Sequence, residues 1–170
     1  GDINNKTFVE VPTNTTIHEL IYKFGGGIPA GKKFKAVQIG GTSGAFIPAE
    51  LLNTPVAFDS MSEIGATLGS GAVLVLDETR DIVDVVTRIA GFFRHESCGK
   101  CAPCREGSAS TYELMSKLNE GFGSSKDISL LEKLGRVMSY SCLCGLGQAA
   151  PTPVLTTIEH FQADYMAKLV

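Results

Sequence analysis

Residues 98–104 read Cys-Gly-Lys-Cys-Ala-Pro-Cys, a C-x2-C-x2-C run around which the second half of the chain is expected to be organised. All five cysteines lie between Cys98 and Cys144, and the first 97 residues contain none. A disulfide framework spreads its bridges over a small chain, and an odd number of cysteines leaves one thiol unpaired. The clustering therefore predicts a metal site in a reducing compartment.

The spacing within this run favours one kind of metal site over another. Three thiols at steps of three residues on a tight loop can converge on one point. Such a run suits three corners of a [4Fe–4S] cluster, with the fourth cysteine supplied from elsewhere. Structural zinc sites more often use two separated cysteine pairs. A zinc site and ordinary buried thiols remain the two alternatives.

The fourth ligand has two candidates, Cys142 and Cys144, in the connection between the third and fourth predicted helices. Cys144 is followed by Gly145 and Gly147, which would let the backbone approach a cluster and offer N–H groups to its sulfurs. We therefore expect Cys144 to be the fourth ligand and Cys142 to be a buried or spare thiol.

Other polar residues lie next to the run. Lys100 and Arg105 flank the thiols, and positive charge there would stabilise the reduced cluster and raise its potential. The alternative is that both are solvated surface charges. His95 is a further candidate, since histidine ligates iron in some centres, but five cysteines make it unnecessary. His18 and His160 are expected at the surface or at the edge of the core.

Composition excludes several classes of protein. Apolar residues make up 44% of the 170 and charged residues 19%, as in ordinary globular domains. The net charge of −3 provides no basic field for nucleic acid. No apolar stretch approaches the ~20 residues that a membrane-spanning helix needs. Neither a nucleic-acid partner nor direct membrane insertion is expected.

Hydrophobic patterning predicts an α+β fold with two domains, residues 1–78 and 79–170. Thr16 and Glu19 form a capping-box pattern, so a helix is expected from residue 17 to residue 24. The continuous apolar run at 72–76 is typical of a central strand. We expect strands at residues 7–11, 35–39, 45–47 and 72–76.

The second domain is predicted to be all-helical. Apolar residues at helical spacing indicate four helices with short connections, the pattern of a four-helix bundle. Asp127 is the expected N-cap of the third. The expected ranges are about 82–93, 106–119, 127–138, and from Pro151 to about 166.

Five stretches resemble a known family. Residues 96–107 resemble the cluster-binding signature of the 51-kDa-type flavoprotein subunit of NADH:quinone oxidoreductase, a module shared with NAD(P)-linked hydrogenases and formate dehydrogenases. Residues 143–151 match the place where that family supplies its fourth cysteine, which supports Cys144. Residues 26–29, 33–37 and 40–44 resemble the family's small β-grasp domain, called SLBB.

The resemblance implies an electron-transfer module whose [4Fe–4S] cluster is held by Cys98, Cys101, Cys104 and Cys144. FMN and NAD(H) would belong to an N-terminal flavin domain of the full-length protein. The glycines at 25–27 and 40–44 lack the spacing of a nucleotide-binding loop. A chain that starts at Gly1 is therefore expected to be a C-terminal piece that does not oxidise NADH alone.

The resemblance also implies partners and a location. The partners would be the flavin domain, a thioredoxin-like 2Fe–2S subunit and other iron–sulfur subunits, in the cytoplasm or peripheral to a membrane complex. The alternative is a soluble-ligand-binding SLBB module with a structural zinc site of the four-cysteine type.

Overall fold

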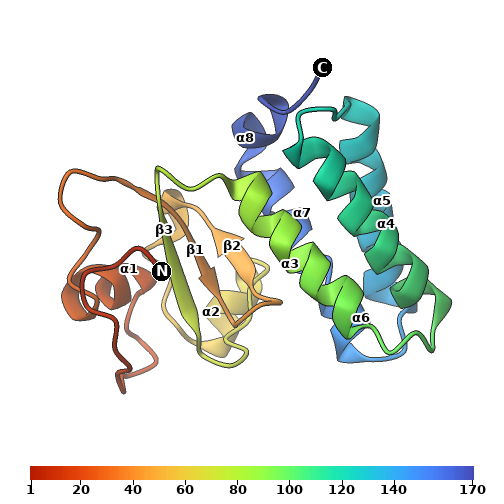
Figure 1. Ribbon diagram of the computed structural model, residues 1–170. Helices are drawn as coiled ribbons and strands as arrows, with labels where there is room; N and C mark the ends of the chain where they lie inside the picture. The colour runs from red at the N-terminus through yellow and green to blue at the C-terminus, as the bar shows by residue number, and fades with distance from the viewer. The chain divides into compact units, whose positions relative to one another are not determined.

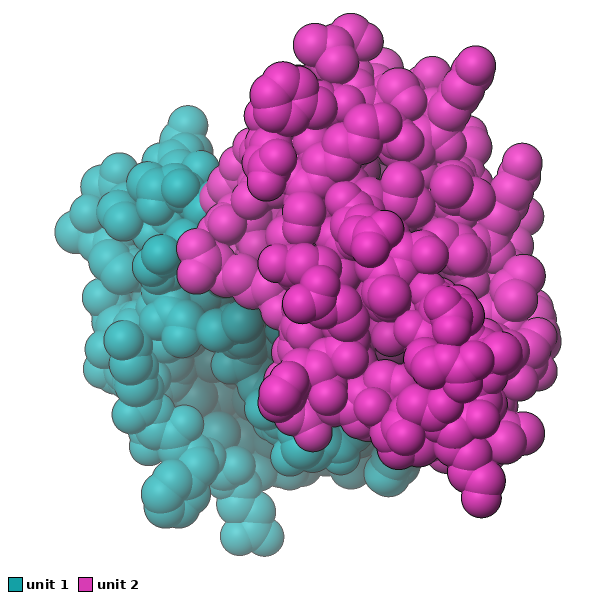
Figure 2. Space-filling model, turned by 45° about the vertical axis from the view of Figure 1, so that its right-hand side comes forward, with its two compact units in different colours: residues 1–80 teal, residues 81–170 magenta.

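The computed structural model describes all residues from Gly1 to Val170 and divides into two compact units (Figures 1 and 2). The first unit runs from Gly1 to Arg80 and combines a small sheet with short helices. The second runs from Asp81 to Val170 and is entirely helical, apart from one isolated bridge between Gly123 and Leu169. The mixed α and β character expected from the sequence is confirmed.

The sheet of the first unit has three antiparallel strands in the order β2-β1-β3 (Figure 1). Val37 of β1 is paired with a residue of each neighbouring strand, Ile47 and Val75. These apolar side chains form a core with the helical residues Ile17 and Ile21. The strands are β1 (Phe34–Ile39), β2 (Ala45–Ile47) and β3 (Val73–Asp77).

The helix predicted after Thr16 is confirmed, with a change of winding inside it. α1 (Ile17–Glu19) continues as the π-helical turn η1 (Leu20–Phe24). The capping box is present: the Glu19 N–H donates to Thr16 Oγ1 at 3.1 Å, and the Thr16 N–H donates to Glu19 Oε2 at 3.0 Å. The unit also contains a 3₁₀ turn, η2 (Ala49–Leu51), and α2 (Phe58–Glu63).

Two strand predictions are wrong. Residues 7–11 alternate like a strand but pair with no other strand, and Phe8 is 97% exposed. The alternating pattern alone is not sufficient, because a strand also needs the edge of another strand to pair with. The run at 72–76 is an edge strand rather than a central one, since β1 is paired on both sides. The first two residues cover part of its free edge, where the Asp2 N–H donates to the Val75 carbonyl oxygen at 2.8 Å.

The end of β3 carries a buried carboxylate. Asp77 is 1% exposed, and its Oδ1 accepts hydrogen bonds from the N–H and hydroxyl of Thr79. Its Oδ2 accepts no hydrogen bond and depends on an ion pair with Lys32 Nζ at 2.8 Å. Lys32 and Thr79 together lower the pKa of Asp77 to about 2.

The second unit has more helices than the four predicted. The expected last helix is interrupted at Phe161, whose φ of −126° and ψ of 42° are not helical. None of the helices is both long and apolar enough to cross a lipid bilayer. The helices are α3 (Ile82–Glu96), α4 (Ala102–Asn119), α5 (Ser125–Ser141), α6 (Gly145–Ala149), α7 (Thr152–His160) and α8 (Gln162–Met166).

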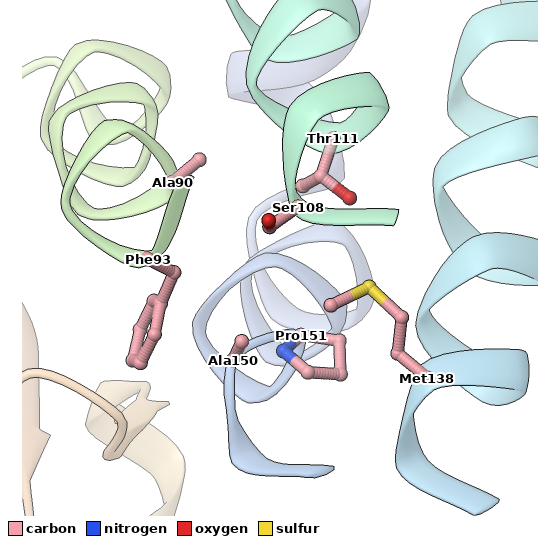
Figure 3. A pocket seen from close by; sticks show the side chains of 7 residues that line it. All are labelled: Ala90, Phe93, Ser108, Thr111, Met138, Ala150 and Pro151. Atoms are coloured by element: carbon pink, nitrogen blue, oxygen red, sulfur yellow. The ribbon is translucent and has the colours of Figure 1, made fainter. Parts of the chain in front are cut away.

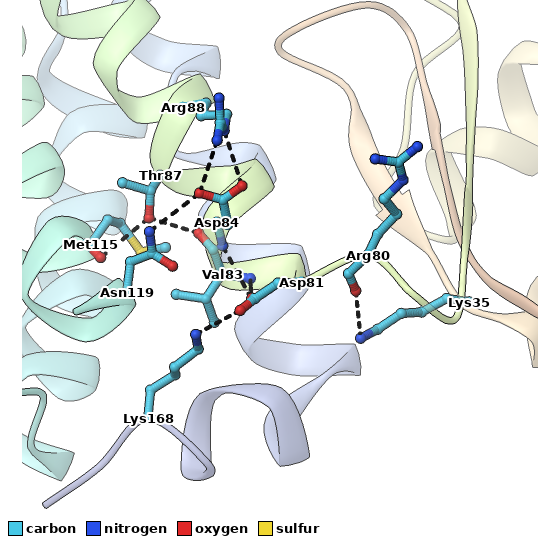
Figure 4. Close-up of polar contacts among 10 residues, drawn as sticks. All are labelled: Lys35, Arg80, Asp81, Val83, Asp84, Thr87, Arg88, Met115, Asn119 and Lys168. Carbon is cyan, nitrogen blue, oxygen red and sulfur yellow. Dashed lines mark hydrogen bonds and ion pairs between the residues drawn. The ribbon is translucent and has the colours of Figure 1, made fainter. Parts of the chain in front are cut away.

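Polar contacts fix the start of α3 (Figure 4). Asp81 caps the helix, because its Oδ1 accepts from the N–H groups of Val83 and Asp84 at 2.9 and 3.2 Å. Lys168 Nζ reaches the other oxygen of Asp81 at 2.6 Å. Further along α3, Thr87 Oγ1 donates to the carbonyl of Val83 and lies 3.2 Å from that of Met115 on α4. These contacts hold α3 against α4 and the C-terminal segment.

α5 begins earlier than predicted. Its N-cap is Ser124, and Asp127 is the third helical residue of a capping box rather than the cap itself. Asp127 Oδ2 accepts from the Ser124 N–H at 2.7 Å and pairs with Lys117 of α4 at 2.8 Å. Lys117 and Ser124 lower the pKa of Asp127 to about 2. This carboxylate therefore ties the start of α5 to the end of α4.

Replacing Asp127 by Asn tests this tie. We expect Asp127→Asn to lower the free energy of unfolding by about 1 kcal/mol at pH 7, measured by urea denaturation. The native pKa, about 2, lies below the ordinary aspartate value of 3.8, so the contribution is present above pH 3.8 and is lost as the pH falls towards 2. The difference between variant and parent should therefore shrink across that range.

Glu113→Gln is the control, because Glu113 is an exposed carboxylate on α4. It should change the unfolding free energy by less than about 0.5 kcal/mol. An equal loss in both variants, or a difference for Asp127→Asn that persists at pH 2, would contradict the assignment.

Candidate metal centre

The C-x2-C-x2-C run bridges the end of α3 and the start of α4 in the second unit. Cys98 lies in the connecting segment, Cys101 is the N-cap of α4, and Cys104 lies in its first turn. The helix begins at Ala102 rather than near Glu106 as predicted from the sequence. Pro103 is tolerated there because the first turn of a helix needs no N–H from it. Two of the three thiols are thus carried by a helix start.

Ser97 and Arg105 hold the connecting segment in place. Ser97 Oγ lies 3.3 Å from Cys104 Sγ and accepts from the Gly99 N–H at 3.4 Å. The Arg105 guanidinium donates to the Gly99 carbonyl at 2.7 Å and pairs with Glu106 at 2.8 Å. Lys100 is exposed on the same segment. Sequence reasoning missed Ser97, whose only signal was its place directly before the cysteine run.

The second cysteine segment joins α5 to α6. Cys142 is the C-cap of α5, where its N–H donates to the Met138 carbonyl at 3.1 Å, and Cys144 is the N-cap of α6. Gln148 of α6 reaches back, since its Nε2 donates to the Cys142 carbonyl at 2.9 Å. Both cysteines therefore lie at helix ends, and hydrogen bonds with residues of α5 and α6 hold the segment that carries them.

The thiol of Cys101 lies where the two segments meet. The backbone N–H groups of Leu143 and Cys104 face this sulfur and lower its pKa. Converging N–H groups stabilise a thiolate because they face the negative charge directly. Leu143 separates Cys142 from Cys144, so this contact brings the second segment onto the first.

Cys142 is a buried part of the same cluster. It is 4% exposed and packs with Cys104, Met138 and Phe93, and Cys101 is partly buried against this group. Burial raises the pKa of Cys142 to about 11, with smaller contributions from Cys101 and Cys104. The expectation that Cys142 is a buried thiol is met at this position.

The remaining candidates lie at the surface. Cys98 and Cys144 are exposed, as is His95 in the last turn of α3. No three Cys, His, Asp or Glu side chains are already arranged to hold a metal ion. The structure therefore packs Cys101, Cys104 and Cys142 together, whereas the side chains of Cys98 and Cys144 are exposed at the surface.

A small pocket lies next to this cluster in the second unit (Figure 3). Its empty volume is about 200 Å³. This volume includes open solvent, and its enclosed part is about the size of one water molecule, so it leaves no room for a dinucleotide. Its lining residues are Ala90, Phe93, Ser108, Thr111, Met138, Ala150 and Pro151.

The residues present suit an iron–sulfur cluster. Thiolates are the usual ligands of such clusters, and hydrogen bonds to their sulfurs are the usual means of tuning them. The Cys101 sulfur already faces backbone N–H groups, and the cluster of thiols is flanked by apolar side chains that keep water away. Gly147 lets the backbone of α6 lie directly against Cys142 and Cys104, where no Cβ would fit.

Comparisons with known proteins agree with this chemistry. Residues 84–168 match the family described as the NADH-ubiquinone oxidoreductase-F iron-sulfur binding region. The chain is 38% identical over 98% of its length to an NADP-reducing hydrogenase subunit HndC of Solidesulfovibrio fructosivorans, covering 34% of that protein. It is 34% identical over 99% of its length to the mitochondrial NADH-ubiquinone oxidoreductase 51 kDa subunit of Neurospora crassa, covering 35% of it.

A solved structure is also similar. An NAD+-reducing [NiFe]-hydrogenase in the H2-reduced state matches all of this chain with a TM-score of 0.87 and 33% identity, over 28% of the hydrogenase chain. The chain therefore spans about a third of the length of the relatives that it matches.

Gly147 provides a test of the packing around the thiols. A Cβ at this position would lie 2.7 Å from Cys142 Sγ and 3.1 Å from Cys104 Cβ. We expect Gly147→Ala to lower the unfolding free energy by about 1–3 kcal/mol, because the Cβ atoms of Cys142 and Cys104 that it meets cannot move without the backbone. Chemical denaturation of the metal-free chain measures this.

Gly145→Ala is the matched control on the same short helix. Its Cβ would meet nothing within 4 Å. It should leave the chain as stable as the parent or slightly more so, since alanine favours helix over glycine. Equal destabilisation by both substitutions would show that the close approach at Gly147 is not what matters.

Proposed function

The chain belongs to the NADH-ubiquinone oxidoreductase-F iron-sulfur binding family, and we propose that it is the [4Fe–4S] electron-transfer module of an NADH-oxidising flavoprotein subunit. The observation that carries the proposal is the meeting of the two cysteine segments. Cys104 of the C-x2-C-x2-C run and Cys142 of the second segment are buried in one group, and both lie against Gly147 of α6. When bound, the cluster supplies a carrier for single electrons.

We propose Cys98, Cys101, Cys104 and Cys144 as its ligands. Cys101 and Cys104 form the inner pair, held by the start of α4, while Cys98 and Cys144 lie on exposed flanking segments. Binding requires the thiols of Cys98 and Cys144 to turn towards the inner pair. Short segments that end at helix caps can make this movement without unfolding either helix.

The chain's own residues would orient the ligands and control their charge. N–H groups of Leu143 and Cys104 stabilise a thiolate at Cys101, and Phe93 and Met138 keep water from its inner side. Lys100 and Arg105 are the cations closest in sequence to the ligands, and we propose that their charge favours the reduced cluster. Arg105 also braces the Gly99 carbonyl, so it would act partly through the loop.

The finer description of the fold is part of the same proposal. Residues 1–78 would form the SLBB-type β-grasp domain, and residues 79–170 a four-helix bundle that carries the cluster. The whole protein would bind FMN and NADH through an N-terminal flavin domain. Its further partners would be a thioredoxin-like 2Fe–2S subunit and other iron–sulfur subunits, in the cytoplasm or at the surface of a membrane complex.

Metal analysis tests the proposal directly. After anaerobic reconstitution with ferrous iron and sulfide, we expect about four irons and four sulfides per chain. Dithionite should then produce the electron paramagnetic resonance (EPR) signal of a reduced [4Fe–4S] cluster. Cys101→Ala and Cys104→Ala should each lower the iron content at least tenfold, because each removes a ligand.

The control is Ser139→Ala, which removes a hydroxyl on α5 that bonds only the Gly135 carbonyl. It should reconstitute like the parent. One zinc per chain, with no iron retained, would overturn the proposal and indicate a structural four-cysteine site in an SLBB-type binding module.

A further inference from the structure

We propose that Cys142 is a reserve ligand, able to take the place of Cys144 in holding the cluster. This inference rests on the proposed function. Four thiolates complete a [4Fe–4S] cluster, and the chain has five cysteines within 47 residues of one another. The fifth thiol is not remote from the others, because the structure places it inside the cysteine cluster.

The packing of Cys142 supports this role. Cys142 and Cys104 belong to one buried group, with Cys101 packed against it. Of the two candidates for the fourth position, Cys142 is therefore the one already in contact with proposed ligands, whereas Cys144 is exposed.

Gly147 explains how a thiol can be accommodated there. Its Cα lies over Cys142 and Cys104, so that an added Cβ would come within 2.7 Å of Cys142 Sγ. The backbone of α6 thus approaches the buried thiol as closely as glycine alone permits. Such an approach places peptide groups, rather than a side chain, beside the sulfur atom.

The segment between the two cysteines allows an exchange. Cys142 and Cys144 are separated only by Leu143, whose N–H faces the Cys101 thiol. Both cysteines therefore flank one fixed point next to a proposed ligand. The exchange is redox-neutral: the iron–sulfur bond to Cys144 breaks, a bond to Cys142 forms, and the proton of the Cys142 thiol passes to Cys144.

An exposed ligand gives the reserve a purpose. Thiolates at a surface are the ones that oxidants reach first, and sulfenic acid formation removes a ligand. Whenever Cys144 is released from the cluster it is exposed, whereas Cys142 is 4% exposed, so an oxidant reaches the first before the second. A chain that could exchange the two would keep its cluster when Cys144 is modified.

The test compares four reconstituted proteins: the parent, Cys142→Ala, Cys144→Ala and the double variant. We expect Cys142→Ala to bind about as much iron as the parent, and Cys144→Ala to retain at least about half, with an altered EPR signal. The double variant should lose at least tenfold, because no fourth thiol is left. Iron and sulfide content and EPR are the readouts.

A second double variant separates ligation from packing. Cys142→Ser with Cys144→Ala keeps a side chain of similar size in the buried position but removes the thiol. It should lose iron to the same extent as the double alanine variant, while circular dichroism shows the same helical content as Cys144→Ala alone.

Two results would overturn the inference. In the first, Cys144→Ala loses at least tenfold of its iron, as the double variant does, which would show that Cys142 cannot replace Cys144. In the second, the double variant retains as much iron as Cys144→Ala, which would show that Cys142 is not the replacement. Failure of the proposed function is distinguishable from both, because the parent chain itself would then bind no iron–sulfur cluster.

Discussion

The approach of the Leu143 N–H to the Cys101 thiol is the contact on which the arrangement of the cysteines depends. It joins two segments that are 42 residues apart in sequence and lie at the ends of different helices. The N-terminal N–H groups of a helix lack partners within that helix. At the start of α4, the Cys104 N–H finds one in the same sulfur atom. The helix start therefore gains an acceptor for a free N–H group, and the thiolate gains a donor that stabilises its charge.

The helices bring these ends together through close packing. Gly107 of α4 lies against Met138 of α5, where a Cβ would come within 2.7 Å of the methionine sulfur. Glycine in a helix interior costs roughly 0.5–1 kcal/mol relative to alanine, so its presence is explained by the approach that it permits. Met138 also packs with Cys104 and Cys142. The contact that joins the two helices is thus the one that closes the inner side of the cysteine cluster.

Sequence patterns identified the chemistry more completely than the local geometry. The cysteine spacing, the Thr16 capping box and the strands at 35–39 and 45–47 depend on neighbouring residues, so they could be predicted. The strand that pairs with a given strand edge is distant in sequence. For this reason the pattern at 72–76 predicts a central strand where the structure has an edge strand, and the pattern at 7–11 predicts a strand where the structure has none. The start of α4 was missed because a proline and two cysteines resemble a loop, although a proline suits a first helical turn.

The sequence also does not show which side of the group of cysteines is buried and which is exposed. Periodicity on α5 could not distinguish Leu131, which is buried, from Val137, which is 54% exposed, since the helices that cover each face are known only from the fold. Likewise, the sequence predicts a buried Cys142 but does not indicate that Cys144 lies at the surface. This asymmetry has a functional consequence under the proposed electron transfer. An inner side closed by Met138 and Phe93 excludes water, while electrons must enter and leave through the outer side, where Cys98 and Cys144 reach the surface.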